Sequence, residues 1–204
     1  MNSSEIRNLI NHKLKRIYKE NYSNKELYDF SKEIVGSIKK FNSKRKTKKN
    51  FILSEKSSLL ICYADSVLGT RANKSITEFK KFYTKYLNNY FNIVHFLPFY
   101  PSSSDSGFAV KDHYKLDKKL GNWSDIYNQS KKTNIMADLV INHASSKGLW
   151  FKNFLNNKSP GKEYFLTVSK KFDISKVIRP RENKLLKSIG ILKKNNFLWR
   201  TFSD

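Results

Sequence analysis

The sequence contains a single cysteine, Cys62, among its 204 residues. One thiol cannot form an internal disulfide, and it excludes a metal site built from several cysteines. No hydrophobic run approaches the roughly 20 residues that cross a bilayer, and the charged N-terminal stretch lacks the apolar region of a secretory signal. We therefore expect a cytoplasmic protein without membrane contact.

Acidic residues are also scarce, since 17 Asp and Glu stand against 40 Lys and Arg, for a formal net charge of +23. Such an excess of cations is typical of proteins that bind nucleic acid or anionic membranes. Most of these cations are lysines, however, whereas arginine makes the forked contacts to phosphate and guanine. We favour compositional drift towards A- and T-rich codons. A basic nucleic-acid-binding module centred on the first 50 residues is kept as the alternative.

Residues 1–42 predict two amphipathic helices, because apolar residues recur there at spacings of three and four. Ser23 and Glu26 form a capping-box pattern where the second helix would begin. The expected unit is a helical hairpin. The cation-rich segment at 43–56 is interpreted as an exposed linker, because like charges repel one another.

Residues 57–143 show the alternation of a parallel sheet covered by helices. Three runs that are apolar on both faces predict strands at 59–64, 93–97 and 135–141. Helices are predicted between them, at 75–87 and 123–131, and Ser75 with Glu78 forms a second capping-box pattern. The fold class is therefore α/β.

Beyond residue 143 the alternation stops. The aromatic cluster around Trp150 predicts a short helix, and two further strands are expected, at 164–168 and near 197–202.

Polar residues gather where the three predicted parallel strands end. Asp65 follows the first strand, the loop 98–108 follows the second, and Asp138 with Asn142 and His143 belongs to the end of the third. Ligands of parallel α/β folds bind at the carboxyl ends of the strands. This position predicts a binding site.

Several of these residues also have a structural interpretation. Asp138 could bond a neighbouring loop or pair with an arginine, and His143 could cap a helix or lie in the core. His95, inside a predicted strand, is expected in the core. His12 and His113 are expected on the surface or in loops.

The segment Asp138 to His143, which reads DLVINH, resembles the first signature region of the α-amylase family of glycoside hydrolases. Further motifs are similar, in order and spacing, to the sucrose phosphorylase subgroup of that family: VHFLPFYP at 94–101, SDSGF at 104–108, DH at 112–113, LGNW at 120–123, WF at 150–151, IRPR at 178–181 and WRTFS at 199–203. The resemblance covers residues 57–204. It implies that residues 57–143 are strands 1–3 of a (β/α)8 TIM barrel with their helices. It also implies that residues 144–204 are a small domain inserted after the third strand, with an incomplete return towards strand 4. The helical hairpin resembles the N-terminal extension of members close to glucosylglycerate phosphorylase.

The resemblance also implies roles for individual side chains. Asp105 and His143 correspond to the pair that binds the hydroxyls of the donor glucosyl ring, and Phe108 corresponds to an aromatic residue that lines the same pocket. Arg181 matches a residue that binds phosphate or the acceptor. Ile178 stands where sucrose phosphorylases have a tyrosine.

Three further residues, Asp65, Asp138 and Asn142, are expected to be structural or to orient the site. Asn142 helps to hold calcium in many amylases, but the phosphorylases usually lack that ion. We therefore expect no metal and no other cofactor.

The carboxylates that would carry the reaction have no match in the sequence. Retaining glucosyl transfer needs a carboxylate nucleophile and a carboxylic acid, which the family places after the fourth and fifth barrel strands. We therefore expect an N-terminal fragment of a phosphorylase that moves a glucosyl unit between an α-glucoside and inorganic phosphate. The fragment would be inactive by itself, and the downstream half of a split gene would be its partner.

Overall fold

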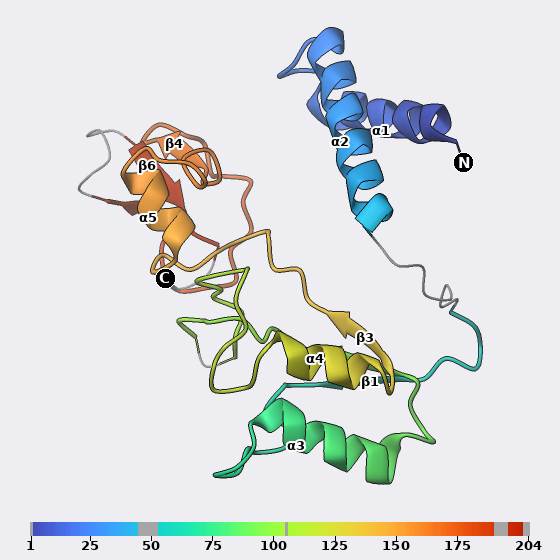
Figure 1. Cartoon of the computed structure of the whole chain (residues 1–204). Helices are drawn as coiled ribbons and strands as arrows, with labels where there is room; N and C mark the ends of the chain where they lie inside the picture. The colour runs from blue at the N-terminus through green and yellow to red at the C-terminus, as the bar shows by residue number, and fades with distance from the viewer. Residues whose placement is uncertain (1, 45–52, 105, 190–195, 202–204) are drawn as a thin grey trace. The chain divides into compact units, whose positions relative to one another are not determined.

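The computed structural model of the chain divides into two compact units, Met1–Ile52 and Leu53–Asp204 (Figure 1). It describes residues 2–44, 53–104, 106–189 and 196–201. Most of the predicted basic linker and Asp105 lie outside the described residues.

The first unit is a pair of helices, α1 (Ser3–Tyr18) and α2 (Asn24–Lys44). The predicted cap of the second helix is confirmed: the Ser23 amide donates to the Glu26 carboxylate at 2.8 Å, and the Glu26 amide donates to Ser23 Oγ at 3.3 Å. Leu27 and Val35 of α2 are buried. In the described part of the chain, every helix is too short or too polar to span a bilayer.

The second unit begins with a parallel sheet in the order β1-β2-β3, as the apolar runs predicted. Its strands are β1 (Leu59–Cys62), β2 (Ile93–Phe96) and β3 (Asn134–Ala137). The third strand ends four residues before its predicted end. A tight turn, in which the Ile141 amide donates to the Leu139 carbonyl at 3.0 Å, leads the chain out of the sheet.

Helices cover one face of this sheet. They are α3 (Ser75–Phe82), which continues as the π-helix η1 (Tyr83–Leu87), and α4 (Trp123–Ser130) (Figure 1). The hydrophobic core lies here, where Phe79 of α3 meets Phe96 of β2 edge to face, with ring centroids 5.0 Å apart. Burial of these apolar side chains fixes the helices on the sheet.

The capping box predicted at Ser75 and Glu78 is wrong. Helix α3 does begin at Ser75, but its cap is Lys74, which makes no side-chain capping bond. The Glu78 carboxylate instead accepts from Lys81 at 3.0 Å and from Thr70 at 3.5 Å. These competing donors explain the failure of the pattern.

The opposite face of the parallel sheet is open within the second unit. Side chains alternate along a strand, so Ile61 and Met136, which flank His95 in register, lie on this face, and both are exposed. His95 is therefore outside the helix-covered core in which we expected it. Its side chain is 12% exposed and contacts Asp138.

The remainder of the second unit holds helix α5 (Leu149–Leu155) and an antiparallel sheet in the order β4-β6-β5. Its strands are β4 (Thr167–Ser169), β5 (Leu186–Ser188) and β6 (Asn196–Trp199) (Figure 1). Helix α5 and strand β6 lie where a helix and a strand were predicted, whereas β4 begins three residues after the predicted start at residue 164. Strand β5 was not predicted, because Leu186 is its one apolar residue and gives neither an apolar run nor an alternation.

The fold of the parallel sheet can be tested at Cys62. Burial raises the pKa of this thiol to about 11, against about 8.5 for a free cysteine. Because only the thiolate reacts, we expect alkylation of the native chain at about pH 8 to be slower than alkylation of the urea-unfolded chain by roughly two hundredfold. Equal rates, measured by mass spectrometry, would show that the sheet around Cys62 is not formed.

Candidate functional site

A pocket of ≈ 920 Å³ opens in the second unit. The segments after β2 and β3 form one part of its wall, and α5 with the antiparallel sheet forms another. Its lining residues fall into those two groups: Ser104, Ser106, Phe108, Ala109, Tyr114, Ile141, Asn142, His143, Ala144 and Ser146 from the first, and Trp150, Phe151, Tyr164, Phe165, Leu166, Arg181, Lys187, Ile189, Leu198, Trp199, Arg200 and Thr201 from the second.

Phe108 reaches the pocket on a loop that depends on a glycine. Gly107 has φ +80°, and a Cβ on it would lie 2.4 Å from the Pro98 carbonyl oxygen. A side chain at this position would therefore push the loop away from the end of β2. A bridge between Ser102 and Val110 closes the base of the loop.

His143 joins the two segments that follow β2 and β3. Its Nε2 lies 2.9 Å from the Phe108 carbonyl and its Nδ1 lies 3.0 Å from Asn142 Oδ1. A carbonyl only accepts, so Nε2 must carry a proton and donate. Nδ1 then either carries a second proton or accepts from the amide nitrogen of a flipped Asn142. Both ring nitrogens are engaged inside the protein.

Two serine contacts reinforce the same junction. Ser103 Oγ and Ser145 Oγ are 2.6 Å apart, and the Ser145 amide donates to the Val110 carbonyl at 3.0 Å. Ser145 is buried, so these bonds are shielded from competing water. The two loops therefore form one wall.

Aromatic rings form part of the pocket around Trp150. The His113 ring stacks on the Trp150 indole, with centroids 4.2 Å apart and planes 10° apart, and Tyr164 meets the indole edge to face at 5.2 Å. His113 Nε2 also donates to the Val140 carbonyl at 2.6 Å. His113 is a loop residue, as predicted, but it packs against the pocket wall.

Arg179 fastens the segment that carries Arg181 to the end of β6. Its guanidinium donates to the Asn183 carbonyl at 2.6 Å, to the Arg200 carbonyl at 3.0 Å and to the Thr201 carbonyl at 3.4 Å. A planar guanidinium can hold several carbonyls at once because its donors are fixed in a fork. Arg179 therefore positions Arg181 beside the antiparallel sheet.

Asp138 lies on the open face of the parallel sheet, outside the pocket lining. Its Oδ1 is 3.2 Å from His95 Nε2, whereas its buried Oδ2 has no hydrogen-bond partner among the described residues. Nearby Tyr100 has a raised pKa, chiefly because burial disfavours its phenolate and secondly because of the Asp138 charge. Asp138 thus contacts the sheet through His95 and does not line the pocket.

The structure brings together four of the residues that the sequence singled out, namely Phe108, Asn142, His143 and Arg181. Asp65 occupies an exposed turn after β1 and does not line the pocket. Sequence reasoning missed the pocket positions of Trp150, Tyr164, Lys187 and Arg200. The aromatic cluster near Trp150 was a usable signal for the first two, and Arg200 stands in the motif WRTFS at 199–203, whereas Lys187, one lysine among many, gave no signal.

The chain is similar in sequence to proteins of one family. A family model described as the α-amylase catalytic domain matches residues 82–188. The glucosylglycerate phosphorylase of Escherichia coli strain K12 is 38% identical over 151 residues, which cover 74% of this chain and 27% of that protein. The sucrose phosphorylase of Bifidobacterium adolescentis is 33% identical over 155 residues, which cover 71% of this chain and 30% of that protein. The chain thus spans less than a third of the length of these relatives.

Solved structures give the same fold class. The sucrose 6F-phosphate phosphorylase of Thermoanaerobacter thermosaccharolyticum has a TM-score of 0.60 and 30% identity, over 74% of this chain and 32% of that chain. The trehalose-6-phosphate hydrolase of Bacillus licheniformis has a TM-score of 0.55 at 16% identity, over 73% of this chain and 29% of that chain, which supports the fold alone. These structural neighbours are TIM-barrel enzymes of the α-amylase family.

Proposed function

Because the chain belongs to the α-amylase family, we propose that it is the N-terminal part of a glucosyl-transferring phosphorylase that binds an α-glucoside and inorganic phosphate. The relatives reported above include glucosylglycerate and sucrose phosphorylases. The alternative of a nucleic-acid-binding module has no support among them. The cytoplasmic location and the absence of a metal stay predictions.

The convergence of Phe108, His143 and Arg181 on one pocket is the observation that carries this proposal. The resemblance assigns these residues to donor and phosphate binding, and they come from three segments that are far apart in the sequence. A chance set of residues would not be expected to share one pocket. Asp105, the fourth residue of the proposed set, lies outside the described residues.

Each of the three side chains suits its proposed task. The ring of Phe108 offers an apolar surface to the carbons of a sugar, and the guanidinium of Arg181 offers paired donors to a phosphate. His143 would bind a sugar hydroxyl at Nδ1 by displacing the Asn142 side chain, since its Nε2 is held by the Phe108 carbonyl. Binding of the sugar should therefore break the contact between His143 and Asn142 and leave the hydrogen bond from His143 to the Phe108 carbonyl intact.

The proposed division of the chain follows the family. Residues 57–143 would be the first three βα units of a TIM barrel, and residues 144–204 a small domain inserted after the third strand. The hairpin at 1–42 and the linker at 43–56 would form an extension before the barrel.

The groups that break and form the glycosidic bond would come from a part of the protein outside this chain. None of the described residues that line the pocket is Asp or Glu, whereas retaining transfer needs two carboxyl groups about 5–5.5 Å apart. One attacks the anomeric carbon, the other protonates the departing oxygen, and phosphate then displaces the enzyme carboxylate. The downstream half of a split gene would supply both groups.

We expect the 204-residue chain to bind D-glucose through this pocket. His143→Ala should weaken binding about tenfold, because it removes a hydrogen-bonding group, and Phe108→Ala should weaken it by a smaller factor. Titration monitored by tryptophan fluorescence measures both effects, since Trp150 and Trp199 line the pocket.

His12→Ala is the matched control for this titration, because His12 is an exposed histidine of α1 in the other unit. Its affinity for glucose should equal that of the unchanged chain. If His143→Ala binds glucose as tightly as His12→Ala, the pocket is not the glucosyl site.

We further expect no phosphorolysis of sucrose or glucosylglycerate by the isolated chain, because the covalent step would have no nucleophile. The assay follows glucose 1-phosphate formed from each glucoside and phosphate. Turnover that disappears in His143→Ala would belong to this protein, and would contradict the proposal that the reacting carboxylates lie elsewhere.

A further inference from the structure

Helix α2 carries a row of apolar side chains that the hairpin leaves exposed. Helix α1 covers another face of α2, where Leu27 and Val35 are buried. The exposed row recurs at spacings of four and three residues, which places its members along one side of a helix. They are between 37% and 67% exposed, and we call them the α2 stripe: Phe30, Ile34, Ile38 and Phe41.

The hairpin buries little apolar surface by itself. In residues 2–43, the buried apolar side chains are those of Leu27 and Val35. Arg7 Nε and Asn11 Oδ1 are also buried, without a hydrogen-bond partner among the described residues, and such atoms cost free energy. Helices depend for most of their stability on the packing of an apolar face. Covering the α2 stripe would therefore stabilise the hairpin.

Two opposite charges border the α2 stripe. Glu33 and Lys40 are seven residues, or about two turns, apart, so they lie on the same side of α2. Both side chains are exposed, and neither forms an ion pair within the described residues. In heptad terms Ile34 and Phe41 occupy a positions, and the two charges occupy flanking g positions, which determine how helices pair in coiled coils.

We propose that the α2 stripe binds a second copy of this chain, with the two α2 helices antiparallel. Gly36 lies midway between Ile34 and Ile38 in the sequence. It also lies close to the midpoint between Phe30 and Phe41. A two-fold axis at the level of Gly36 therefore places each stripe residue of one copy opposite a stripe residue of the other, as a symmetric dimer requires.

The same axis pairs the charges. The midpoint between Glu33 and Lys40 lies next to Gly36, so each Glu33 would face Lys40 of the second copy. An antiparallel pair brings the same flank of both helices together, and this ion pair would therefore form twice. A parallel pair would instead place the two charges against the other flank, where Ser31 and Ile38 lie. The charges thus favour the antiparallel arrangement.

The presence of both signs favours a second copy over other partners. An amphipathic helix that binds an anionic membrane carries cations beside its apolar face, whereas Glu33 would be repelled by lipid phosphates. The phosphates of a nucleic acid would repel Glu33 as well, and they would leave Ile34 uncovered. Two hairpins joined through α2 would form a four-helix bundle, in which apolar faces of this kind are buried.

The experiment measures the dissociation constant of the dimer for the full 204-residue chain, by sedimentation equilibrium at an ionic strength of about 0.15 M. We expect the 24.0 kDa monomer to be in equilibrium with a dimer. Ile34→Asp should raise the dissociation constant at least a hundredfold, roughly, because each copy would bury a charge in the contact. Leu68→Asp is the control, since Leu68 is an exposed apolar residue of the second unit, and its dimer should match that of the unchanged chain.

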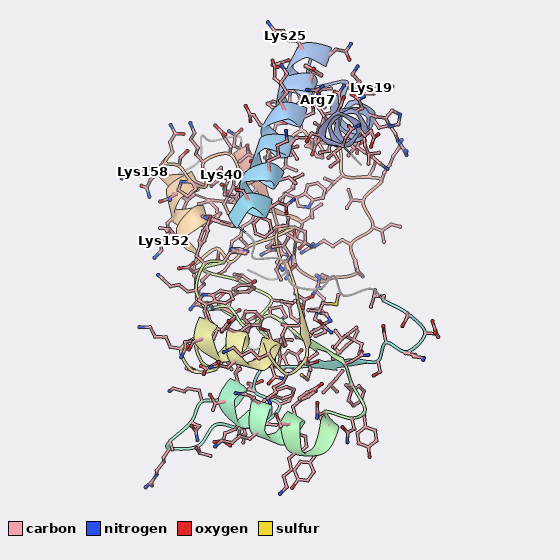
Figure 2. All side chains as sticks on the ribbon, turned by 45° about the vertical axis from the view of Figure 1, so that its right-hand side comes forward. Arg7, Lys19, Lys25, Lys40, Lys152 and Lys158 are labelled. Atoms are coloured by element: carbon pink, nitrogen blue, oxygen red, sulfur yellow. The ribbon has the colours of Figure 1, made fainter. Side chains whose placement is uncertain are left out.

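Charge reversals test the pairing itself. Glu33→Lys and Lys40→Glu should each raise the dissociation constant about tenfold, because two attractive pairs become repulsive. The double variant should restore it to within about threefold of the unchanged value. Lys25→Glu is the matched control for Lys40→Glu. It changes the net charge equally, but Lys25 lies at the other end of α2 (Figure 2), so the dimer should be unaffected.

Each outcome supports or overturns the dimer. Weakening by both single reversals with recovery in the double variant would support it, because a simple effect of net charge would act in opposite directions in the two. A monomer at all concentrations, an unchanged dimer in Ile34→Asp, or no recovery in a double variant that keeps its helix content by circular dichroism would overturn it. A monomer that cosediments with phosphatidylserine vesicles, and no longer does so as Ile34→Asp, would overturn it in favour of a membrane surface.

Discussion

The hydrogen bond from His143 Nε2 to the Phe108 carbonyl is the interaction on which the pocket depends. It joins the loop after β2 to the segment after β3, so that two separate strand ends make one wall. Ser145 strengthens the same junction through its bonds to Ser103 and to the Val110 carbonyl. The helix-covered core holds the parallel strands in register. The two loops that meet at this junction therefore start from fixed positions. The exposed aromatic ring of Phe108 is thereby held at the pocket.

The antiparallel sheet contributes cationic side chains to the pocket, which the segments after the parallel strands do not. The polar groups after β2 and β3 are neutral donors and acceptors, whereas the second sheet and the Arg181 segment bring cations. Arg179 links the Arg181 segment to the end of β6 through backbone carbonyls, so a residue outside the pocket lining helps to position a charge within it. A pocket assembled in this way can distinguish two chemically different parts of one substrate.

The sequence predicted the parallel strands from their continuous apolar runs, but it also implied burial on both faces, whereas β1 and β3 are covered on one face only within the described residues. It also predicted the cap at Ser23, where the Glu26 carboxylate accepts from the amide and the hydroxyl of Ser23. The same pattern failed at Ser75, because Lys81 and Thr70 hold the Glu78 carboxylate. Phe108, His143 and Arg181 were found through resemblance to a family. Lys187 could not be found in this way, since only the register of a three-residue strand brings it to the pocket.

The central claim is that one pocket binds a glucosyl group at one end and an anion at the other. Titration of the isotope-labelled chain with α-D-glucose 1-phosphate, followed by amide chemical shifts, tests this claim most directly. The account predicts shifts in both groups of lining residues, at 106–109 and 142–146 and at 181–187 and 198–201, with residues 2–44 unchanged. Shifts confined to one of these two groups, or shifts centred on residues 2–44, would contradict it.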